Sequence, residues 1–531
     1  MFEILFLVVS VLLIYLLIVK PQQYWSKRNV KTGRTVPFFG DNFRIILGKE
    51  SSSEMFQRIY NKVQNVRYIG IYQFLTPVLF LKSPELMKQI CVKDFDHFLN
   101  HKGYLPDGVD ELWSKNLVGL KGQSWKNMRS VLSPTFTSSK MKSMFTLMCH
   151  NAELFSQHFM KKTGNVTEVE FKDAFTRYTN DVIASTAFGL QVDSLEDKNN
   201  EFYLMGKEVS ELSSLRRKLV VFAYQLFPTI STFFRIPMFG KKIKDFFINL
   251  VKETIKIREE QNIKRPDMLG LLIQARKGQP SGEHTSDVKE VSFAVVEEHL
   301  AMTEAARSLS DMDIASQVFV FFLGGFETVS TAMCFMAYEL AVNPNIQKKL
   351  IEEIDQNKPQ KEPPTYELLC NMTYMDMVVT ETLRKWPVTI ATERVVTKPY
   401  VIEPKLPGEK PVHLEKDTLI LIPTFAIHRD PQYYEHPEKF DPERFSPENR
   451  KNINPYAYMP FGVGPRNCIG SRFALLEVKA VFFYLLSNFE IIPVEKTVIP
   501  LKTSRTSLTL TSENGFTMGL KKRELSKLSC S

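Results

Sequence analysis

Apolar and polar positions divide the chain into a short apolar N-terminal segment and a long body. Residues 4–19 are apolar apart from Ser10 and Tyr15. A membrane-spanning helix needs roughly 20 apolar residues, with about 17 as the lower limit, so this segment is marginal in length. A cleaved signal peptide is the alternative, but no cleavage site with small residues follows. We therefore predict an uncleaved signal anchor over residues 1–20.

Charges on the two sides of the apolar segment predict its orientation. Glu3 precedes the segment, and basic residues follow it: Lys20, Lys27, Arg28, Lys31 and Arg34. The positive-inside rule then places the bulk of the chain in the cytosol. Residues 21–45, which include Pro37 and Gly40, are predicted to form a basic linker that acts as a hinge.

Beyond residue 45 the pattern is mostly helical. Strand-like runs are short, at residues 67–81, 418–423 and 506–511, and no internal repeat is visible. The most linker-like interior stretch, residues 277–289, is expected to be an exposed loop. This pattern predicts a mainly α fold with small β-sheets, of the α+β class.

Composition and charge narrow the choice of partners. The net charge is +9, but no nucleic-acid recognition motif accompanies it, so we expect no nucleic-acid partner. Basic residues beside a membrane anchor attract anionic lipid head groups, which favours membrane lipid as a partner. The cysteines are too scattered for a zinc site and too few for a disulfide framework, which suits the reducing cytosol.

One cysteine, Cys468, lies in the run F-G-V-G-P-R-N-C-I-G at residues 461–470. Gly464 and Gly470 allow the backbone to fold tightly around the sulfur, where a side chain would collide with a flat cofactor. Backbone N–H groups stabilise a thiolate, and Arg466 can pair with a carboxylate on the cofactor's rim. Such a loop suits an axial thiolate ligand of haem iron. A buried structural cysteine is the alternative.

This loop resembles the F-x-x-G-x-R-x-C-x-G signature of the cytochromes P-450. The resemblance implies that Cys468 binds the iron of haem b. It also implies that four neighbours surround the cofactor: Phe461, Gly464, Arg466 and Gly470. Other motifs follow in the order typical of the family.

Two of these motifs match the family's buried ion cluster. Glu381 and Arg384 form an E-x-x-R, and the i, i+3 spacing puts both charges on one helix face. By resemblance, Arg444 in the run P-E-R-F completes the cluster. Its implied role is structural, and losing one partner would leave a buried charge unpaired.

A third motif, G-G-F-E-T at residues 324–328, lies inside the apolar stretch 314–338. Two glycines in a helix interior cost roughly 1 kcal/mol each relative to Ala, which makes sense if the helix approaches a cofactor closely. The motif resembles the family's oxygen-activation segment and implies that Thr328 and Glu327 support proton delivery. The family usually has Thr or Ser directly after this threonine. In this chain that position is Val329, and Ser330 follows it. A proton-delivery network that differs from the family's is therefore an open alternative.

The last motif is W-x-x-x-R, formed by Trp125 and Arg129. On a helix these two residues share a face, so both can reach one haem propionate. A surface Trp–Arg stack is the alternative for the motif taken alone. By resemblance, Arg394 and Arg466 are further propionate-binding residues.

Together these motifs resemble a microsomal cytochrome P-450. The resemblance implies one haem-binding monooxygenase domain over residues 46–525, on the cytosolic face of the endoplasmic reticulum membrane. The chain has no G-x-G-x-x-G after a strand and no flavin-domain sequence. A separate NADPH-dependent diflavin reductase is therefore implied, with a cytochrome b-type protein as a further electron donor. The basic residues that we expect to face the reductase are Lys121, Lys126, Arg472 and Lys479.

Details of the central helix look most like the insect microsomal enzymes of family nine. That likeness implies lipophilic foreign compounds, such as plant toxins or insecticides, as substrates. The candidate substrate pocket is Val320, Phe321, Gly324, Thr389, Ile390 and Ala391, capped by the loop at residues 104–117. The apolar stretch 219–239 is expected to touch the bilayer.

Three alternative functions remain open at this point. One is an endogenous lipid or hormone hydroxylase, and another is a haem-thiolate isomerase or dehydratase that needs no reductase. The third is a non-catalytic haem- or ligand-binding protein. Thr328 disfavours the isomerase, because rearrangements have less need of a proton-delivering threonine, and intact Glu327 and Thr328 disfavour a mere binding protein.

Overall fold

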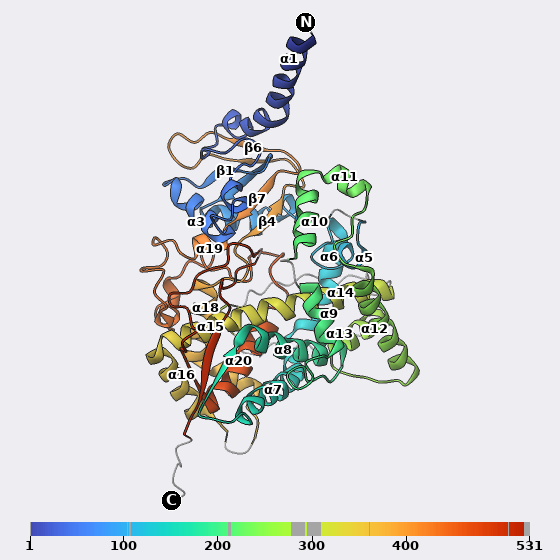
Figure 1. Ribbon diagram of the computed structural model, residues 1–531, viewed down its shortest axis with the longest axis vertical. Helices are drawn as coiled ribbons and strands as arrows, with labels where there is room; N and C mark the ends of the chain where they lie inside the picture. The colour runs from blue at the N-terminus through green and yellow to red at the C-terminus, as the bar shows by residue number, and fades with distance from the viewer. Residues whose placement is uncertain are drawn as a thin grey trace, which may run out of the picture.

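The computed structural model describes residues 2–103, 105, 108–210, 214–277, 292–294, 309–359, 362–507 and 509–524. Helix α1 (Phe2–Ile14) continues as a π-helical turn (Tyr15–Val19) and projects away from the rest of the chain (Figure 1). Two described helices are apolar and long enough to cross a membrane, Phe2–Val19 and Asp311–Val342. The second is 67% buried inside the protein, whereas the first is 0% buried. Of these two, the N-terminal helix is therefore the candidate anchor.

A four-stranded sheet lies at the α1 end of the molecule (Figure 1). Its strand order is β1-β2-β7-β4, so strands from distant parts of the sequence lie side by side. The strands are β1 (Tyr68–Gln73), β2 (Thr76–Leu81), β7 (Leu419–Ile422) and β4 (Thr392–Val395). The β2–β7 pair is parallel and the other two pairs are antiparallel. The strand-like runs at residues 67–81 and 418–423 thus form strands of one sheet.

The predicted linker of residues 21–45 differs in the structure. Trp25 is 0% exposed, and its indole Nε1 donates to the carbonyl oxygen of Ile71 at 3.1 Å. A Cβ at Gly70 would lie 2.4 Å from the Trp25 ring, so the glycine makes room for the indole. Lys31 O also accepts the Gly70 N–H at 2.9 Å, and the Asp41 N–H donates to Tyr72 O at 2.8 Å, so parts of this segment are held on β1. The large apolar surface of a tryptophan favours burial over a solvated linker.

Helices form most of the remaining structure (Figure 1). The helices before the centre of the chain are α2 (Phe43–Ile46), α3 (Ser52–Lys62), α4 (Pro84–Lys88), α5 (Glu111–Ser114), α6 (Gly122–Leu132), α7 (Ser138–Met160), α8 (Phe171–Ile183), α9 (Glu201–Ser210), α10 (Leu215–Leu226), α11 (Pro228–Phe233), α12 (Lys241–Glu260) and α13 (Met268–Arg276). Those after it are α14 (Asp311–Leu323), α15 (Ser330–Val342), α16 (Pro344–Asn357), α17 (Tyr366–Asn371), α18 (Thr373–Lys385), α19 (Thr424–Ile427) and α20 (Ser471–Asn488). The predicted α+β class with a majority of helix is confirmed.

The central element is a continuous rod made of α14, a π-helical turn η9 (Gly324–Val329) and α15. It begins at Ser310, whose side chain forms a capping box with Asp313. Nearly all of α15 is buried, as expected for a helix that is apolar all round. Helices α8, α12 and α20 pack against the rod. The rod is therefore a fixed support for any site beside it.

Two smaller sheets complete the fold. One contains β3 (Val166–Glu170), β9 (Thr517–Lys522) and β8 (Phe489–Ile492), and the other pairs β5 (Tyr400–Ile402) with β6 (Val412–Leu414). The strand predicted at residues 506–511 is wrong, since the described residues there form bends and loop. Most of the loop predicted at residues 277–289 lies outside the described residues.

Candidate active site

A cavity of about 710 Å³ lies beside the central rod. Its walls come from the rod, α6, the segment 459–470 and the start of α20, with a loop before α6 on another side. Apolar side chains dominate the lining, and the polar ones are concentrated near Cys468 and Thr328. A cavity of this size and character suits a lipophilic small molecule together with a flat cofactor.

Cys468 opens onto this cavity just before α20 begins. Its backbone N–H donates to the carbonyl oxygen of Phe461 at 2.8 Å, and the Asn467 N–H donates to Gly464 O at 2.8 Å. These two bonds close the segment into a tight loop around the sulfur. Burial raises the pKa of the Cys468 thiol, while the Gly470 N–H and the Arg129 charge oppose that shift. A metal cation at the sulfur would add the charge needed to hold it as a thiolate.

Gly464 and Gly470 were both predicted to leave room for a flat cofactor, but their surroundings in the structure differ. Gly464 has a φ of +76°, and a Cβ there would lie 1.9 Å from the carbonyl oxygen of Cys91. Gly464 does not line the cavity, so it is required by the turn and by Cys91, not by the flat cofactor. Gly470 does line the cavity, and its Cβ would meet only Phe136 at 3.8 Å. The clearance for a flat cofactor therefore stays a prediction at Gly470, whereas the turn and Cys91 account for Gly464.

Three buried arginines, Arg129, Arg394 and Arg466, gather at the loop. Arg129 donates to Asn467 O at 3.1 Å and to Asn467 Oδ1 at 2.6 Å. Arg466 lies 4.1 Å from the centre of the Trp125 ring. Burial, with the neighbouring charges of Arg394 and Arg129, lowers the pKa of Arg466 to about 8. The site is thus strongly cationic.

This cationic site fits a dianionic cofactor. Among the described residues neither Arg394 nor Arg466 forms an ion pair with a carboxylate, and Arg394 Nε is buried without a hydrogen-bond partner. Buried cations are costly unless an anion compensates them. The two propionates of a haem, bound with its iron at Cys468, would supply that charge and the missing acceptor. Trp125, Arg129 and Arg466 line the cavity, and Arg394 lies behind its wall.

His101 also lines this part of the cavity and was not predicted from the sequence. Its Nδ1 lies 2.9 Å from Glu393 O, a carbonyl that can only accept, so Nδ1 carries the hydrogen. Burial, followed by the charges of Arg394 and Arg466, holds the pKa of His101 well below its ordinary value. No motif surrounds His101 in the sequence, so only the spatial position of the arginines reveals it.

The central rod lines the cavity that Cys468 also lines, mainly through the π-helical turn η9. A Cβ at Gly324 would meet nothing within 4 Å, whereas one at Gly325 would lie 2.4 Å from Ile183 of α8. Gly324 therefore leaves open space in the cavity, and Gly325 lets α8 pack closely. The Thr328 hydroxyl, exposed to the cavity, donates to Gly324 O. The extra residue of a π-helical turn is a frequent feature of functional sites.

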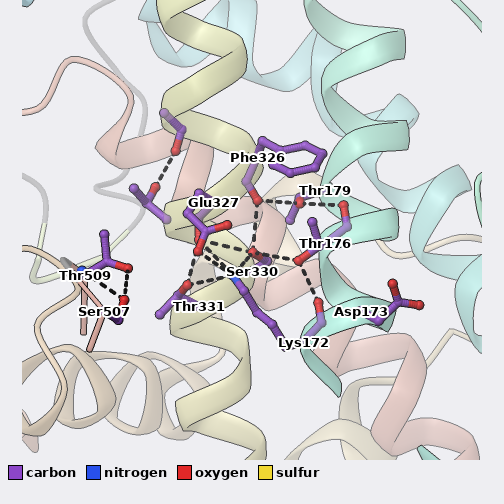
Figure 2. Close-up of polar contacts among 12 residues, drawn as sticks. Lys172, Asp173, Thr176, Thr179, Phe326, Glu327, Ser330, Thr331, Ser507 and Thr509 are labelled. Atoms are coloured by element: carbon purple, nitrogen blue, oxygen red, sulfur yellow. Dashed lines mark hydrogen bonds and ion pairs between the residues drawn. The ribbon is translucent and has the colours of Figure 1, made fainter. Parts of the chain in front are cut away.

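Glu327 is held by a lysine from α8, as Figure 2 shows. Lys172 Nζ lies 3.0 Å from Glu327 Oε1, 2.9 Å from Ser330 Oγ and 2.8 Å from Thr331 Oγ1. An ammonium group has three hydrogens, so each finds an acceptor. Glu327 also lines the cavity, and both members of the ion pair are partly exposed. The carboxylate therefore connects the cavity to the α8 side of the rod.

Ser330 does not replace the missing hydroxyl at Val329. Its Oγ donates within the rod, to Phe326 O at 2.9 Å, and it is not among the cavity-lining residues (Figure 2). Val329 lines the cavity in its place. One residue further along a helix turns the side chain by about 100°, which carries the Ser330 hydroxyl away from Thr328.

The candidate pocket residues divide into two groups. Val320, Phe321, Gly324 and Thr389 line the cavity. Ile390 and Ala391 are not among the lining residues and pack in the cores beside β4. Of the predicted capping loop, residues 104, 106 and 107 lie outside the described residues. The described remainder contributes cavity-lining side chains at Trp113 and Leu117.

The predicted ion cluster lies behind the cysteine loop. Arg384 donates to both carboxylate oxygens of Glu381, at 2.7 and 2.8 Å, and both side chains are 0% exposed. Arg444 Nε lies 3.6 Å from Glu381 Oε1 without a hydrogen bond, and its Nη2 donates to His436 O. Arg384 also donates to His428 O at 3.0 Å. The cluster therefore joins α18 to the segments that lead to the cysteine loop.

Lys479, which was predicted to face an electron donor, lies in the core of the protein instead. Lys479 is fully buried in α20, and its Nζ lies 2.9 Å from Asp376 Oδ1 of α18. It therefore joins two core helices and is excluded from any docking surface. Lys126 is partly exposed and lies 2.7 Å from Asp96 Oδ1.

His428 connects the ion cluster to the segment that leads into the cysteine loop. Because it is buried in its neutral form, we expect the protein to lose stability in acid. Its Nδ1 donates to Arg384 O at 3.1 Å, and its Nε2 accepts the Met459 N–H at 2.9 Å. Burial, assisted by the Arg384 charge, lowers the pKa of His428 to about 3. The unfolded chain takes up this proton below about pH 6.5, so stability is lost as the pH falls from there toward 3. At pH 5 the expected loss is about 2 kcal/mol.

The His428→Gln variant tests this expectation, because a carboxamide has both a donor and an acceptor but does not titrate. We expect the thermal half-life of the wild-type protein to fall more steeply between pH 7 and pH 5 than that of the variant. Parallel pH profiles for the two proteins would contradict a neutral, hydrogen-bonded His428.

Comparison with known proteins agrees with this geometry. The family model described as Cytochrome P450 matches residues 30–518. Cytochrome P450 9e2 of Blattella germanica is 41% identical over 529 residues, which cover 97% of this chain and 96% of that protein. Probable cytochrome P450 9f2 of Drosophila melanogaster is 39% identical over 94% of this chain and 95% of its own. Cytochrome P450 6k1 of Blattella germanica is 36% identical over 93% and 92%. The chain therefore belongs to the cytochrome P450 family of haem-containing monooxygenases.

Proposed function

We propose that this protein is a membrane-bound monooxygenase that hydroxylates lipophilic foreign compounds, such as plant toxins or insecticides. The observation that carries the proposal is one cavity whose lining includes Cys468 as well as Gly324 and Thr328. Its apolar walls favour lipophilic substrates over polar ones. Relatives of family nine and family six among insect proteins support a xenobiotic role.

Each residue of the site has a proposed task. Bound haem with a thiolate ligand supplies the chemistry of O–O bond cleavage and C–H hydroxylation. Cys468 provides that ligand, and the arginines hold the propionates: Arg129, Arg394 and Arg466 with the Trp125 indole. Thr328 and Glu327 hold and pass protons on the opposite side, where Gly324 leaves room. The apolar walls exclude water and orient the substrate.

The proposal also requires an external source of electrons and contact with a membrane. We infer an NADPH-dependent diflavin reductase as the electron source, with a cytochrome b-type protein as a further donor. The anchor, Phe2–Val19, would place the protein in the endoplasmic reticulum membrane with the site on the cytosolic side. Exposed apolar side chains of α10 and α11 would touch the same bilayer: Leu219, Phe222, Ile230 and Phe233.

Reconstitution with a diflavin reductase and a lipophilic 7-alkoxycoumarin tests the proposal. We expect substrate-dependent NADPH consumption and hydroxylation of the alkyl carbon next to the ether oxygen. The resulting hemiacetal breaks down to 7-hydroxycoumarin, which keeps the ether oxygen, and an aldehyde, whose oxygen comes from O₂ while the second oxygen atom leaves as water. An isomerase or dehydratase would turn over its substrate without NADPH, and a binding protein would consume none. A hormone hydroxylase would convert an endogenous lipid in preference to the coumarin when both are present in the assay.

Thr328→Ala is the variant that probes proton delivery in the same assay. We expect NADPH consumption to continue while product per NADPH falls at least about tenfold and hydrogen peroxide rises, since the proton-delivering hydroxyl is lost. Ser316→Ala on the same rod is the control, because its hydroxyl donates to Met312 O at 2.8 Å and Ser316 is not among the cavity-lining residues. Equal coupling in the two variants would contradict the role of Thr328.

A further inference from the structure

We propose that Gln317 is a specificity-determining residue that sets the space above the cofactor, although its side chain does not line the cavity. It acts through the loop that covers the cavity, residues 108–120, called here the cover loop. The proposal rests on the proposed function, because it concerns which lipophilic ligands the same site admits. Its starting point is that two distant residues grip one peptide segment of this loop from opposite sides.

Gln317 lies on α14 and is 0% exposed. Its Oε1 accepts the backbone N–H of Leu117 at 2.9 Å, and its Nε2 donates to Lys115 O at 2.7 Å. The second Nε2 hydrogen goes to Asp313 O, at 3.3 Å, within the same helix. The carboxamide thus pairs with the loop as a neighbouring β-strand would, with its hydrogens and its oxygen all used.

Arg466 holds the same loop from the side of Cys468. Its Nη1 donates to Leu117 O at 3.3 Å, and its Nη2 donates to Leu120 O at 2.8 Å. Leu117 is therefore held through its N–H by the central rod and through its carbonyl by the cofactor-binding loop. Together, Gln317 and Arg466 fix the position of the cover loop relative to the cavity.

Asn116 makes the cover loop a stiff unit between these supports. Its Oδ1 accepts the N–H groups of Val118 and Gly119, both at 2.9 Å, and its Nδ2 donates to Leu112 O at 3.0 Å. A Cβ at Gly119 would lie 2.1 Å from Trp113 O, so the turn is also closely packed. A stiff loop moves as a body when one support is lost, instead of relaxing locally.

The part of the loop that Gln317 holds faces the ligand. Trp113, Leu117 and Val118 all line the cavity. Without the carboxamide, the buried Leu117 N–H and the partly buried Lys115 C=O lose their partners, and the loop must shift toward water to satisfy them. Such a shift carries Trp113 and Leu117 away from a bulky ligand, which loses their contacts, but it leaves a small ligand at the cofactor unaffected.

Two imidazole probes measure this difference in full-length protein held in lipid nanodiscs. Imidazole and clotrimazole both bind haem iron through an imidazole nitrogen, but clotrimazole adds three aryl rings that need the space under the cover loop. We expect Gln317→Leu to weaken clotrimazole binding about tenfold and to change imidazole affinity less than about twofold, as followed by the Soret shift. The reduced, carbon monoxide-bound spectrum should remain that of the wild type.

Ser316→Ala is the matched control on the same helix. The Ser316 hydroxyl bonds chiefly within the helix, to Met312 O at 2.8 Å, and only at 3.4 Å to Glu111 O of the cover loop. Both affinities should stay at wild-type values. Gln317→Glu, which keeps the acceptor for Leu117 and loses the donor to Lys115, should shift the affinity ratio in the same direction as Gln317→Leu.

An unchanged clotrimazole-to-imidazole affinity ratio in Gln317→Leu would overturn the proposal. If that variant does not fold, hydrogen exchange of the Leu117 amide in the wild-type protein decides: slow exchange supports the clamp, and exchange at the rate of an unprotected amide overturns it. Failure of the proposed function is separate, because it would show as absent NADPH-dependent turnover while the affinity ratio still responds to Gln317.

Discussion

Replacing Cys468 with serine is expected to abolish the strongly red-shifted Soret band of the reduced, carbon monoxide-bound protein. The band depends on a thiolate ligand, and a serine hydroxyl in the same loop does not donate electron density as a thiolate does. Monooxygenase turnover should fall to background, because the thiolate favours O–O cleavage. Haem is expected to remain bound in part, since the buried charges that we propose to compensate its propionates, those of Arg129, Arg394 and Arg466, are unchanged.

Cys370→Ser is the control for this experiment, because Cys370 is only partly buried and lies on α17, outside the residues that line the cavity. It should leave the band unchanged. A normal red-shifted band in Cys468→Ser would show that another residue binds the iron.

Short-range spacing predicted the parts of the site that lie on one element. Glu381 and Arg384 share a face of α18 because they are three residues apart, and they do form a buried pair. Glycine next to Cys468 predicted a tight turn, and the turn exists. The close packing at Gly464 was not predicted, because its neighbour, Cys91, comes from a segment more than 300 residues away, which no local pattern reveals.

Long-range packing explains the other differences. The burial of Lys479 depends on Asp376 of α18, and that of Trp25 depends on a glycine in β1. His101 joins the site only because β4 carries Arg394 and Glu393 to the same place. A polar residue in the apolar stretch 314–338, Gln317, was visible in the sequence, but its partners in the cover loop lie 200 residues earlier. Family membership and fold class were predicted correctly because the motifs that define them are local.

Replacing Arg384 with leucine is expected to have the largest effect on folding. Glu381 would then be buried without its main partner, which typically costs about 3–5 kcal/mol. The carbonyl of His428 would also lose its donor, and the support of the cysteine loop would weaken. Since a typical domain is stable by only about 5–15 kcal/mol, we expect little haem-loaded protein at 37 °C. The half-life of the Soret band at fixed temperatures measures the effect.

A second variant and a control separate the buried charge from the general loss of a side chain. The double variant Glu381→Leu with Arg384→Leu should survive longer than Arg384→Leu alone, because no unpaired charge remains in the core. Lys349→Met removes an exposed ion pair of 3.2 Å to Glu443 and should change the half-life little. If the double variant is as short-lived as the single one, the cluster stabilises the protein through the hydrogen bonds of Arg384 to backbone carbonyls, and charge pairing with Glu381 is not its main contribution.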